Sequence, residues 1–323
     1  MKVRQQLITI FENNRGSFLS GEELASRLGC SRAAVWKAVN ALRAQGYRIS
    51  ASTNKGYVLE PENDVISAAA IKRYLGNLAD RFDIRAFASV DSTNIVIRDL
   101  ASKGAPEWTA AIAGMQTAGR GRLGRSFFSP SDTGLYLSIL LKPDMPADEA
   151  VRITTAAAVA VAQTIEEVSG RETAIKWVND VYIEGRKVCG ILTEASFSPE
   201  TGGLEYAVVG IGVNAYEPEG GFPKEIRDIA GAVLTERQED MRNRLAGGIL
   251  KRLYLACQDL SSTITLAEYR RRLMWIGERA VTQGALQLEG EITGVDENYA
   301  LKLRLDDGTE KAVRSGEISI RRK

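Results

Sequence analysis

The fold class is decided by the stretch Gln116-Thr117-Ala118-Gly119-Arg120-Gly121-Arg122-Leu123-Gly124-Arg125. Residues 119–124 fit the G-x-G-x-x-G pattern of dinucleotide-binding folds, but that pattern needs a helix directly after it, because the pyrophosphate binds at a helix N-terminus. Residues 125–132 have no helical periodicity. A second match at 210–215 is followed by residues 216–221, which contain proline and two glycines and predict no helix. The sequence therefore argues against a doubly wound dinucleotide-binding fold.

The same stretch places three arginines among three glycines. Glycines let backbone N–H groups approach an anion, and arginines bind phosphate or carboxylate through two parallel hydrogen bonds. A merely exposed loop has no need for this charge density, and we expect repulsion between the arginines to keep it mobile until a polyanion orders it. The stretch lacks the G-x-x-x-x-G-K-S/T pattern, so it is not a Walker-type phosphoryl-transfer loop.

Strand and helix patterns mix on both sides of this loop. The spacing predicts two hairpins: 182–183 with 187–195 around Gly185, and 188–197 with 204–213 around Thr201-Gly202-Gly203. Because hairpins join antiparallel strands, we expect a mixed sheet with helices packed on it. The predicted strands are 82–88, 109–115, 134–141, 173–177, 188–197 and 204–213, and the predicted helices are 67–76, 92–103 and 147–169.

The first sixty residues have the pattern of a winged helix-turn-helix. Apolar residues at helical spacing predict a first helix, the Ser-x-x-Glu capping box at Ser20 begins a second, and Gly29 ends it. Ser31 caps a third helix that ends at Gly46. Residues 47–59 then predict a hairpin with a polar turn at Thr53-Asn54-Lys55-Gly56.

This segment carries net charge +5, from nine basic and four acidic residues, while the remainder of the chain carries −4. A basic module on a mildly acidic chain favours DNA binding, with the third helix in the major groove, over the alternative of a protein docking module. Trp36 is left open, because it either packs against the first helix or touches DNA. The predicted DNA-binding residues are Ser31, Arg32, Ala33, Trp36, Lys37, Asn40 and Lys55.

Composition excludes several function classes. The 323 residues are 44% hydrophobic and contain no histidine, which removes Ser-His-Asp and Cys-His catalysis and His-ligated zinc. The three cysteines, Cys30, Cys189 and Cys257, are far apart, so we expect buried thiols in a reducing cytoplasm and no metal site built from protein side chains. No signal peptide or membrane-spanning run is visible, so no membrane partner is expected.

Several motifs in one order resemble the biotin–protein ligases, and with the winged helix in front the whole chain resembles the bifunctional form, ligase plus biotin operon repressor. They are the arginine–glycine loop, Asp91-Ser92-Thr93-Asn94, Lys176-Trp177-Val178-Asn179-Asp180, Gly185-Arg186-Lys187-Val188-Cys189-Gly190-Ile191-Leu192-Thr193-Glu194 and Val209-Gly210-Ile211-Gly212-Val213-Asn214. Two positions depart from the family pattern: Val178 stands where proline is usual, and Phe127 near the usual place of a tryptophan.

The resemblance implies an α+β multidomain protein. Residues 1–62 are expected to form the winged helix-turn-helix DNA-binding domain. Residues 63–275 are expected to form a mixed-sheet α/β ligase domain, resembling the class II synthetase/biotin ligase fold, that binds biotin and ATP. Residues 276–323 are expected to form a small SH3-like β-barrel. Strand patterns at 279–282, 286–296, 300–305 and 310–314, with a turn at Asp306-Asp307-Gly308, agree with this.

The implied activity has two steps: biotin carboxylate attacks the α-phosphorus of ATP, with Mg²⁺ present, and a lysine of a biotin carboxyl carrier protein then takes the biotinyl group from the adenylate. The adenylate also acts as corepressor of a homodimer on operator DNA. The expected catalytic residues are Arg120, Arg122, Lys187 and Asp180; the biotin-binding residues are Ser92, Thr93, Asn94, Gln116, Arg120, Gly121, Arg122 and Lys187; the nucleotide-binding residues are Arg122, Arg125, Phe127, Lys176, Asn179 and Asn214.

Three questions stay open at the level of sequence. Asp180 either orients the acceptor amine or accepts its proton, or it only caps a turn. A nucleotide-sensing winged-helix repressor that binds NAD without catalysis is an alternative of a different class, which the residues after the glycine patterns disfavour. A lipoate-type acyl ligase on a similar scaffold is a nearer alternative, and periodicity does not separate it from a biotin ligase.

Overall fold

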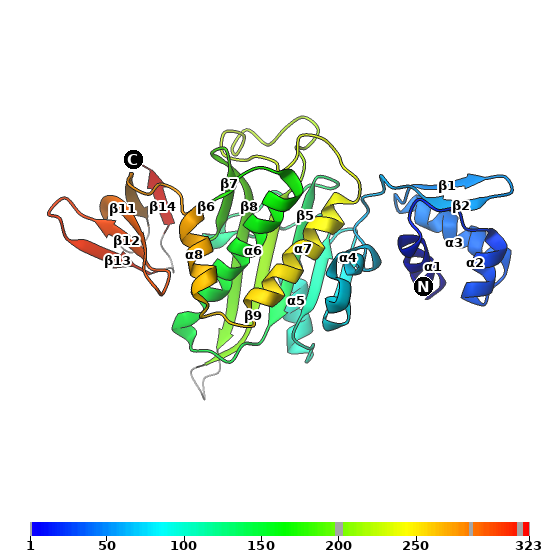
Figure 1. Cartoon of the computed structure of the whole chain (residues 1–323), viewed down its shortest axis with the longest axis horizontal. Coiled ribbons are helices and arrows are strands. Elements are labelled where there is room, and N and C mark those ends of the chain that lie inside the picture. The colour runs from blue at the N-terminus through cyan, green and yellow to red at the C-terminus, as the bar shows by residue number, and fades with distance from the viewer. Residues whose placement is uncertain (1, 198–202, 284–286, 315–318, 323) are drawn as a thin grey trace.

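The computed structural model describes residues 2–197, 203–283, 287–314 and 319–322. Its elements form three parts in a row: the winged helix at one end, a large sheet flanked by helices in the middle and a smaller sheet at the other end (Figure 1). The N-terminus and the C-terminus therefore lie at opposite ends of the molecule.

The winged-helix segment follows the sequence prediction closely. The side chain of Ser20 accepts a hydrogen bond from the Glu23 N–H at 3.0 Å, Gly29 is left-handed with φ +59°, and Ser31 accepts from the Ala34 N–H at 3.2 Å. Trp36 is 56% exposed, so it does not pack against the first helix. The elements are α1 (Lys2–Asn13), α2 (Gly21–Leu28), α3 (Arg32–Ala44), β1 (Ile49–Ser52) and β2 (Gly56–Leu59).

The middle sheet is mixed, as the hairpin patterns predicted. Its order is β3-β4-β5-β9-β8-β7-β6; only β3 and β4 pair in parallel, and every other neighbouring pair is antiparallel. Thr201 and Gly202 of the predicted β8–β9 turn lie outside the described residues. The strands are β3 (Asp83–Phe87), β4 (Thr109–Ala113), β5 (Gly134–Leu141), β6 (Ala174–Lys176), β7 (Asp180–Ile183), β8 (Arg186–Phe197) and β9 (Leu204–Asn214).

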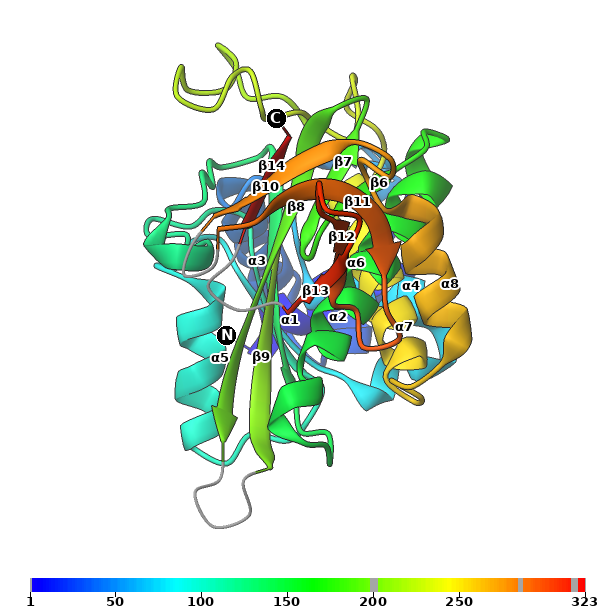
Figure 2. The same ribbon diagram turned by 90° about the vertical axis from the view of Figure 1, so that its left-hand side faces the viewer.

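Helices cover both faces of this sheet (Figure 2). One face packs under α5 (Thr93–Ser102), where Ile97, Leu140 and Val208 are fully buried. The other face packs under α6 (Val151–Ser169), α7 (Met241–Ala256) and α8 (Thr263–Arg272). Short helices complete the part: α4 (Ala68–Leu75), η1 (Gly76–Arg81), η2 (Arg122–Gly124) and η3 (Ala147–Glu149). No helix of the described residues is both long and apolar enough to cross a membrane.

Two helices, α7 and α8, were not predicted. Gly247 and Gly248 in the middle of α7 lower its helix propensity, so its pattern does not stand out. The tertiary structure requires Gly247, because a Cβ there would lie 2.5 Å from the Cβ of Tyr74 on α4. The predicted helix 147–169 is also divided, since the 3₁₀ turn η3 precedes α6.

A buried charge cluster joins the winged helix to the middle of the chain. Arg15 at the end of α1 lies 2.7 Å from Glu12 (Nη2 to Oε2) and 3.0 Å from Asp240 (Nη2 to Oδ1). The Tyr74 hydroxyl donates to Asp240 Oδ2 at 2.8 Å. Burial raises the pKa of Asp240 to about 6; Arg15 opposes this shift and the neighbouring Glu12 carboxylate adds to it.

The C-terminal sheet is antiparallel throughout, in the order β13-β12-β11-β10-β14. Four of its strands were predicted and β14 was not; Leu286, at the predicted start of the second, lies outside the described residues. The sheet rests on the middle part, where the Trp177 indole donates to the Tyr299 carbonyl at 2.9 Å. The strands are β10 (Arg279–Gln283), β11 (Glu289–Val295), β12 (Leu301–Arg304), β13 (Glu310–Val313) and β14 (Ser319–Arg322).

Candidate active site

One pocket lies under the arginine–glycine loop, which we call the flap (residues 116–128). Its floor is the glycine-containing middle of β8 and β9, its walls are the start of α5 and the turn between β6 and β7, and Ile320 of β14 reaches it from the C-terminal sheet. The lining residues are Ser92, Thr93, Asn94, Gln116, Arg120, Gly121, Arg122, Leu123, Arg125, Ser126, Phe127, Lys176, Trp177, Asn179, Asp180, Lys187, Gly190, Ile191, Leu192, Gly210, Ile211, Gly212 and Ile320.

We call Ser92, Thr93, Asn94 and Gln116 the neutral end of the pocket, since they offer hydrogen bonds without net charge. Thr93 donates its backbone N–H to Gln116 Oε1 at 2.9 Å, which fixes the amide of Gln116. The side chains of Ser92, Thr93 and Asn94 are all nearly fully buried at the first turn of α5. Uncharged polar groups held this way suit the recognition of an uncharged polar ring.

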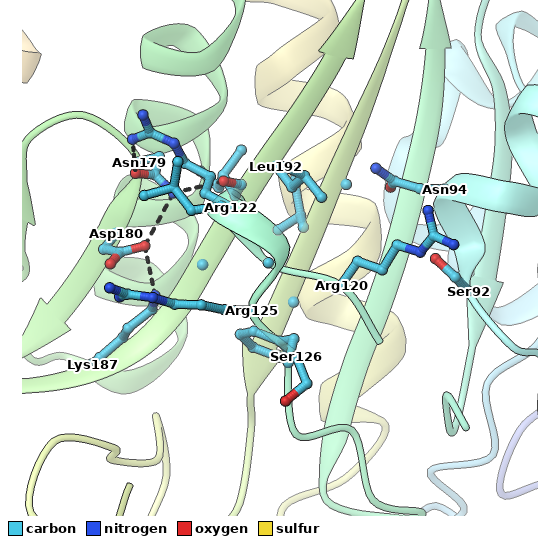
Figure 3. Close-up of a pocket in the computed structure, with 18 of the residues that line it drawn as sticks. Ser92, Asn94, Arg120, Arg122, Arg125, Ser126, Asn179, Asp180, Lys187 and Leu192 are labelled. Atoms are coloured by element: carbon cyan, nitrogen blue, oxygen red, sulfur yellow. Dashed lines mark hydrogen bonds and ion pairs between the residues drawn. The ribbon is translucent and has the colours of Figure 1, made fainter. Parts of the chain in front are cut away.

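We call Arg122, Arg125, Lys176, Asn179, Asp180 and Lys187 the cationic end. Arg122 crosses the pocket to donate from Nη1 to Asn179 Oδ1 at 3.0 Å, and Lys187 pairs with Asp180 at 2.7 Å (Nζ to Oδ1). Burial lowers the pKa of Arg122 and Asp180 opposes that shift, yet a guanidinium keeps its charge at neutral pH. Figure 3 shows Arg122, Lys187, Asn179 and Asp180 together, with Arg120 directed toward Ser92 and Asn94.

The floor is glycine because the Phe127 ring rests on it. A Cβ at Gly212 would lie 2.5 Å from Phe127 Cε1, and one at Gly190 would lie 3.2 Å from Phe127 Cε2. Phe127 is half-buried, and the Tyr136 ring lies edge-on to it at 6.4 Å between centroids. The flap is thus attached to the sheet through an aromatic ring as well as through Arg122.

The pocket brings together every predicted catalytic and biotin-binding residue and all but one of the predicted nucleotide-binding residues. The exception is Asn214. It does not line this pocket; its side-chain amide donates to the Gly231 carbonyl at 3.0 Å. That bond ties the end of β9 to residues 229–231, whose backbone also holds Lys187, through a 2.7 Å bond from the Lys187 N–H to the Ile229 carbonyl.

Some lining and supporting residues were missed. Ser138 interrupts the otherwise apolar strand 134–141, and a serine there could have indicated a functional contact. Nothing in the sequence around Ile320 indicates that it reaches the pocket. Cys189 is fully buried, as predicted, and burial raises the pKa of its thiol, whereas Cys30 and Cys257 are only half-buried. Among the described residues, no group of three acidic or cysteine side chains is placed to hold a metal ion.

The predicted DNA-binding residues lie at the start of and along α3 and at the tip of the β1–β2 hairpin. Arg32, Trp36 and Lys37 are exposed on α3, and Asn40 is half-buried one turn further on. Lys55 is exposed at the tip of the β1–β2 hairpin, where its Nζ lies 5.6 Å from the Phe18 ring centroid. Ser31 and Ala33 are exposed at the start of the same helix.

Comparison with known proteins agrees with a winged helix followed by a separate middle part that holds the pocket. Residues 86–214 match the biotin/lipoate A/B protein ligase family, and residues 3–58 match a helix-turn-helix domain. The biotin protein ligase of Aquifex aeolicus, solved in complex with biotin and ATP, superposes with a TM-score of 0.62 and 26% identity, covering 75% of this chain and 99% of that chain.

Two curated relatives match nearly end to end. The bifunctional ligase/repressor BirA of Bacillus subtilis is 33% identical over 327 residues, which cover 98% of each chain. The bifunctional ligase/repressor BirA of Escherichia coli is 31% identical over 322 residues, covering 98% of this chain and 96% of the relative. This chain has a winged helix followed by a pocket under the flap, and it belongs to the bifunctional ligase/repressor family of biotin protein ligases.

Proposed function

We propose that this chain joins biotin to a lysine of a biotin carboxyl carrier protein, through biotinyl-5′-AMP, and that it also represses biotin genes. The observation that carries the proposal is the polarity of the pocket: one end holds four uncharged polar side chains, with Arg120 directed toward them, and the other end is cationic, in one cavity under the flap. Biotin has that same division, with an uncharged urea ring at one end and a carboxylate at the other.

In the first step the biotin carboxylate oxygen bonds to the α-phosphorus of ATP, and the bond from that phosphorus to the bridging oxygen of pyrophosphate breaks. The carboxylate is ionised at pH 7 and needs no base. The step requires alignment and neutralisation of negative charge, which Arg120, Arg122 and Lys187 provide. Ser92, Thr93, Asn94, Gln116 and Gly121 hold biotin, while Arg125, Phe127, Lys176 and Asn179 face the nucleotide.

In the second step the lysine amine of the acceptor bonds to the acyl carbon, and the acyl–oxygen bond breaks to release AMP. The amine loses a proton as it becomes an amide. Asp180 lies in the pocket and holds Lys187, so we assign it to orient the amine or take that proton. Magnesium would enter with ATP, bound to its phosphates, and would lower their negative charge.

The repressor activity rests on the α3 surface with Lys55. We propose that the adenylate orders the flap, that this favours a homodimer, and that two winged helices then bind a two-fold symmetric operator in the cytoplasm. We assign DNA binding to residues 1–62, catalysis to residues 63–275 and acceptor docking to residues 276–323.

The decisive experiment is incubation of the purified protein with biotin, ATP and Mg²⁺, followed by native mass spectrometry and by transfer of labelled biotin to a carboxyl carrier domain. We expect bound biotinyl-5′-AMP and a labelled acceptor. If the protein activates lipoate in preference to biotin, it is a lipoate-type ligase. If it retains NAD and forms no adenylate, it is a nucleotide-sensing repressor without ligase activity.

A further inference from the structure

Glu194 stands behind the neutral end of the pocket and does not line it. Its Oε2 accepts a hydrogen bond of 2.6 Å from Asn94 Nδ2, and its Oε1 lies 3.4 Å from Nη1 of Arg98 on the outer side. Ser138, fully buried on β5, contacts two residues of the same end: its Oγ lies 2.6 Å from Asn94 Oδ1 and 2.7 Å from Thr93 Oγ1.

Counting hydrogens fixes the orientation of the Asn94 amide and of the Ser138 hydroxyl. A carboxylate only accepts, so Asn94 must turn Nδ2 toward Glu194 and Oδ1 toward Ser138. The single hydroxyl hydrogen of Ser138 must then be donated to Asn94 Oδ1, because nothing else can donate in that contact. The single hydrogen of the Thr93 hydroxyl then has two acceptors within the protein, the Ser138 oxygen at 2.7 Å and Gln116 Oε1 at 3.1 Å.

Thr93 and Asn94 are therefore fixed in polarity by groups outside the pocket. With its hydrogen directed to Ser138 or to Gln116 Oε1, the Thr93 hydroxyl presents only lone pairs to a ligand, and Asn94 is prevented from exchanging its oxygen and nitrogen. Space for Asn94 is also fixed, since a Cβ at Gly210 would lie 2.1 Å from Asn94 Oδ1. Burial strengthens the arrangement, because an unpaired polar atom here has no water to replace its partner.

We propose that Glu194 and Ser138 are positioning residues that set which atoms of the neutral end donate and which accept, and thereby its selectivity for the biotin ring. The inference rests on the proposed function, which places that ring at this end. The chemistry is directional: the carboxylate starts a chain of hydrogen bonds that passes through Asn94, Ser138 and Thr93 in turn.

The test uses biotin and 2-iminobiotin, a guanidinium at neutral pH, in which a positively charged N–H donor replaces the urea oxygen acceptor. The dissociation constants of both are measured calorimetrically for the wild-type protein, Glu194→Gln and Ser138→Ala. In Glu194→Gln, Asn94 is free to reverse. In Ser138→Ala, which changes no charge, Glu194 still holds Asn94 Nδ2, but Asn94 Oδ1 loses its donor and the Thr93 hydroxyl loses one of its two acceptors, so it can turn its hydrogen toward a ligand. We expect biotin binding to weaken about tenfold, the worth of one buried hydrogen bond, and the preference for biotin over 2-iminobiotin to narrow about fivefold.

Arg98→Gln is the matched control, because it removes the outer partner of Glu194 and leaves the chain of hydrogen bonds complete. Its two dissociation constants should stay within twofold of wild type. The rate of transfer from preformed adenylate should also stay within twofold in Glu194→Gln, because the ring is already seated when transfer begins.

The outcomes separate this inference from the proposed function. Wild-type protein that binds neither biotin nor 2-iminobiotin contradicts the proposed function. Wild-type protein that binds biotin, with variants that keep its affinity or lose affinity for both probes equally, contradicts the positioning role alone, since a general packing defect does not change a selectivity ratio.

Discussion

The ammonium of Lys187 lies 2.7 Å from the carboxylate of Asp180, Nζ to Oδ1, at the cationic end of the pocket. Both side chains are partly exposed, at 28% for Lys187 and 20% for Asp180, so an entering ligand can reach them. The pair keeps the charge of each group balanced before an anion binds. We propose that a carboxylate or phosphate that binds Lys187 frees Asp180 for an incoming amine.

Replacing Asp180 by asparagine separates the two chemical steps. We expect adenylate formation within about threefold of wild type and transfer to the acceptor lysine slowed about a hundredfold, because a neutral amide cannot take a proton. Single-turnover transfer from preloaded adenylate measures the second step directly. Glu184→Gln, an exposed carboxylate paired with Arg171 away from the pocket, is the control for charge loss. A wild-type rate of transfer in Asp180→Asn would show that Asp180 has only a structural role.

Replacing Arg122 by alanine should release the adenylate. The side chain bridges the flap to Asn179, so its loss removes a cation and a contact that keeps the flap over the pocket. We expect the half-life of bound adenylate to fall by about tenfold or more, with the melting temperature nearly unchanged. Arg85→Ala, an exposed arginine on β3, serves as the control. An unchanged half-life contradicts the clamp assignment.

Substituting alanine at Gly212 should expel the Phe127 ring from the floor, since the new Cβ would lie 2.5 Å from that ring. We expect the KM for ATP to rise several-fold while the fold persists, because the clashing atoms belong to a side chain that can move. Phe127→Ala should cause a similar rise. The double variant should be no worse than Phe127→Ala, because two changes at one contact do not add; additive losses would show that Gly212 acts separately.

Asp240 predicts a pH dependence of stability. Its pKa is raised to about 6 in the folded protein, so between pH 4 and 6 the folded state binds more protons there than the unfolded state does. Its contribution to stability therefore increases as the pH falls, by about 1 kcal/mol between pH 7.5 and 5.

Asp240→Asn lacks this titration and keeps the left-handed backbone of residue 240, which asparagine tolerates. Denaturant unfolding at pH 7.5 and at pH 5 should show the wild-type protein gaining about 1 kcal/mol relative to the variant. Carboxylates outside the Arg15 cluster contribute equally to both proteins and cancel. Parallel pH profiles for the two proteins would rule out this assignment.

Replacing Lys37 by alanine should weaken operator binding without affecting biotin transfer. The side chain is exposed on α3 and not buried in the fold, so its loss removes one phosphate contact. The slope of binding against salt should fall by about one. Lys103→Ala, an exposed lysine at the end of α5, should leave DNA binding unchanged. If Lys37→Ala binds DNA as tightly as the wild-type protein does, Lys37 is not part of the DNA-binding surface.

Local signals predicted most of the winged helix and the middle sheet. Capping at Ser20 and Ser31 and the turn at Gly29 act within a few residues, so sequence alone reveals them. The helices α7 and α8 were missed because their stability comes from packing; Gly247, unfavourable in an isolated helix, is required where α7 meets Tyr74.

The sequence by itself determined the kinds of groups available: a basic helix, a flap of arginines and glycines, and no histidine for catalysis. The sequence also showed the order in which the motifs follow one another along the chain. Only the tertiary structure decided which of these groups meet, that Asn214 supports a backbone segment while Ile320 reaches the pocket, and that Lys187 pairs with Asp180. The physical reason is that side-chain contacts between distant segments depend on how strands and helices pack, whereas caps, turns and charge density depend on neighbouring residues alone.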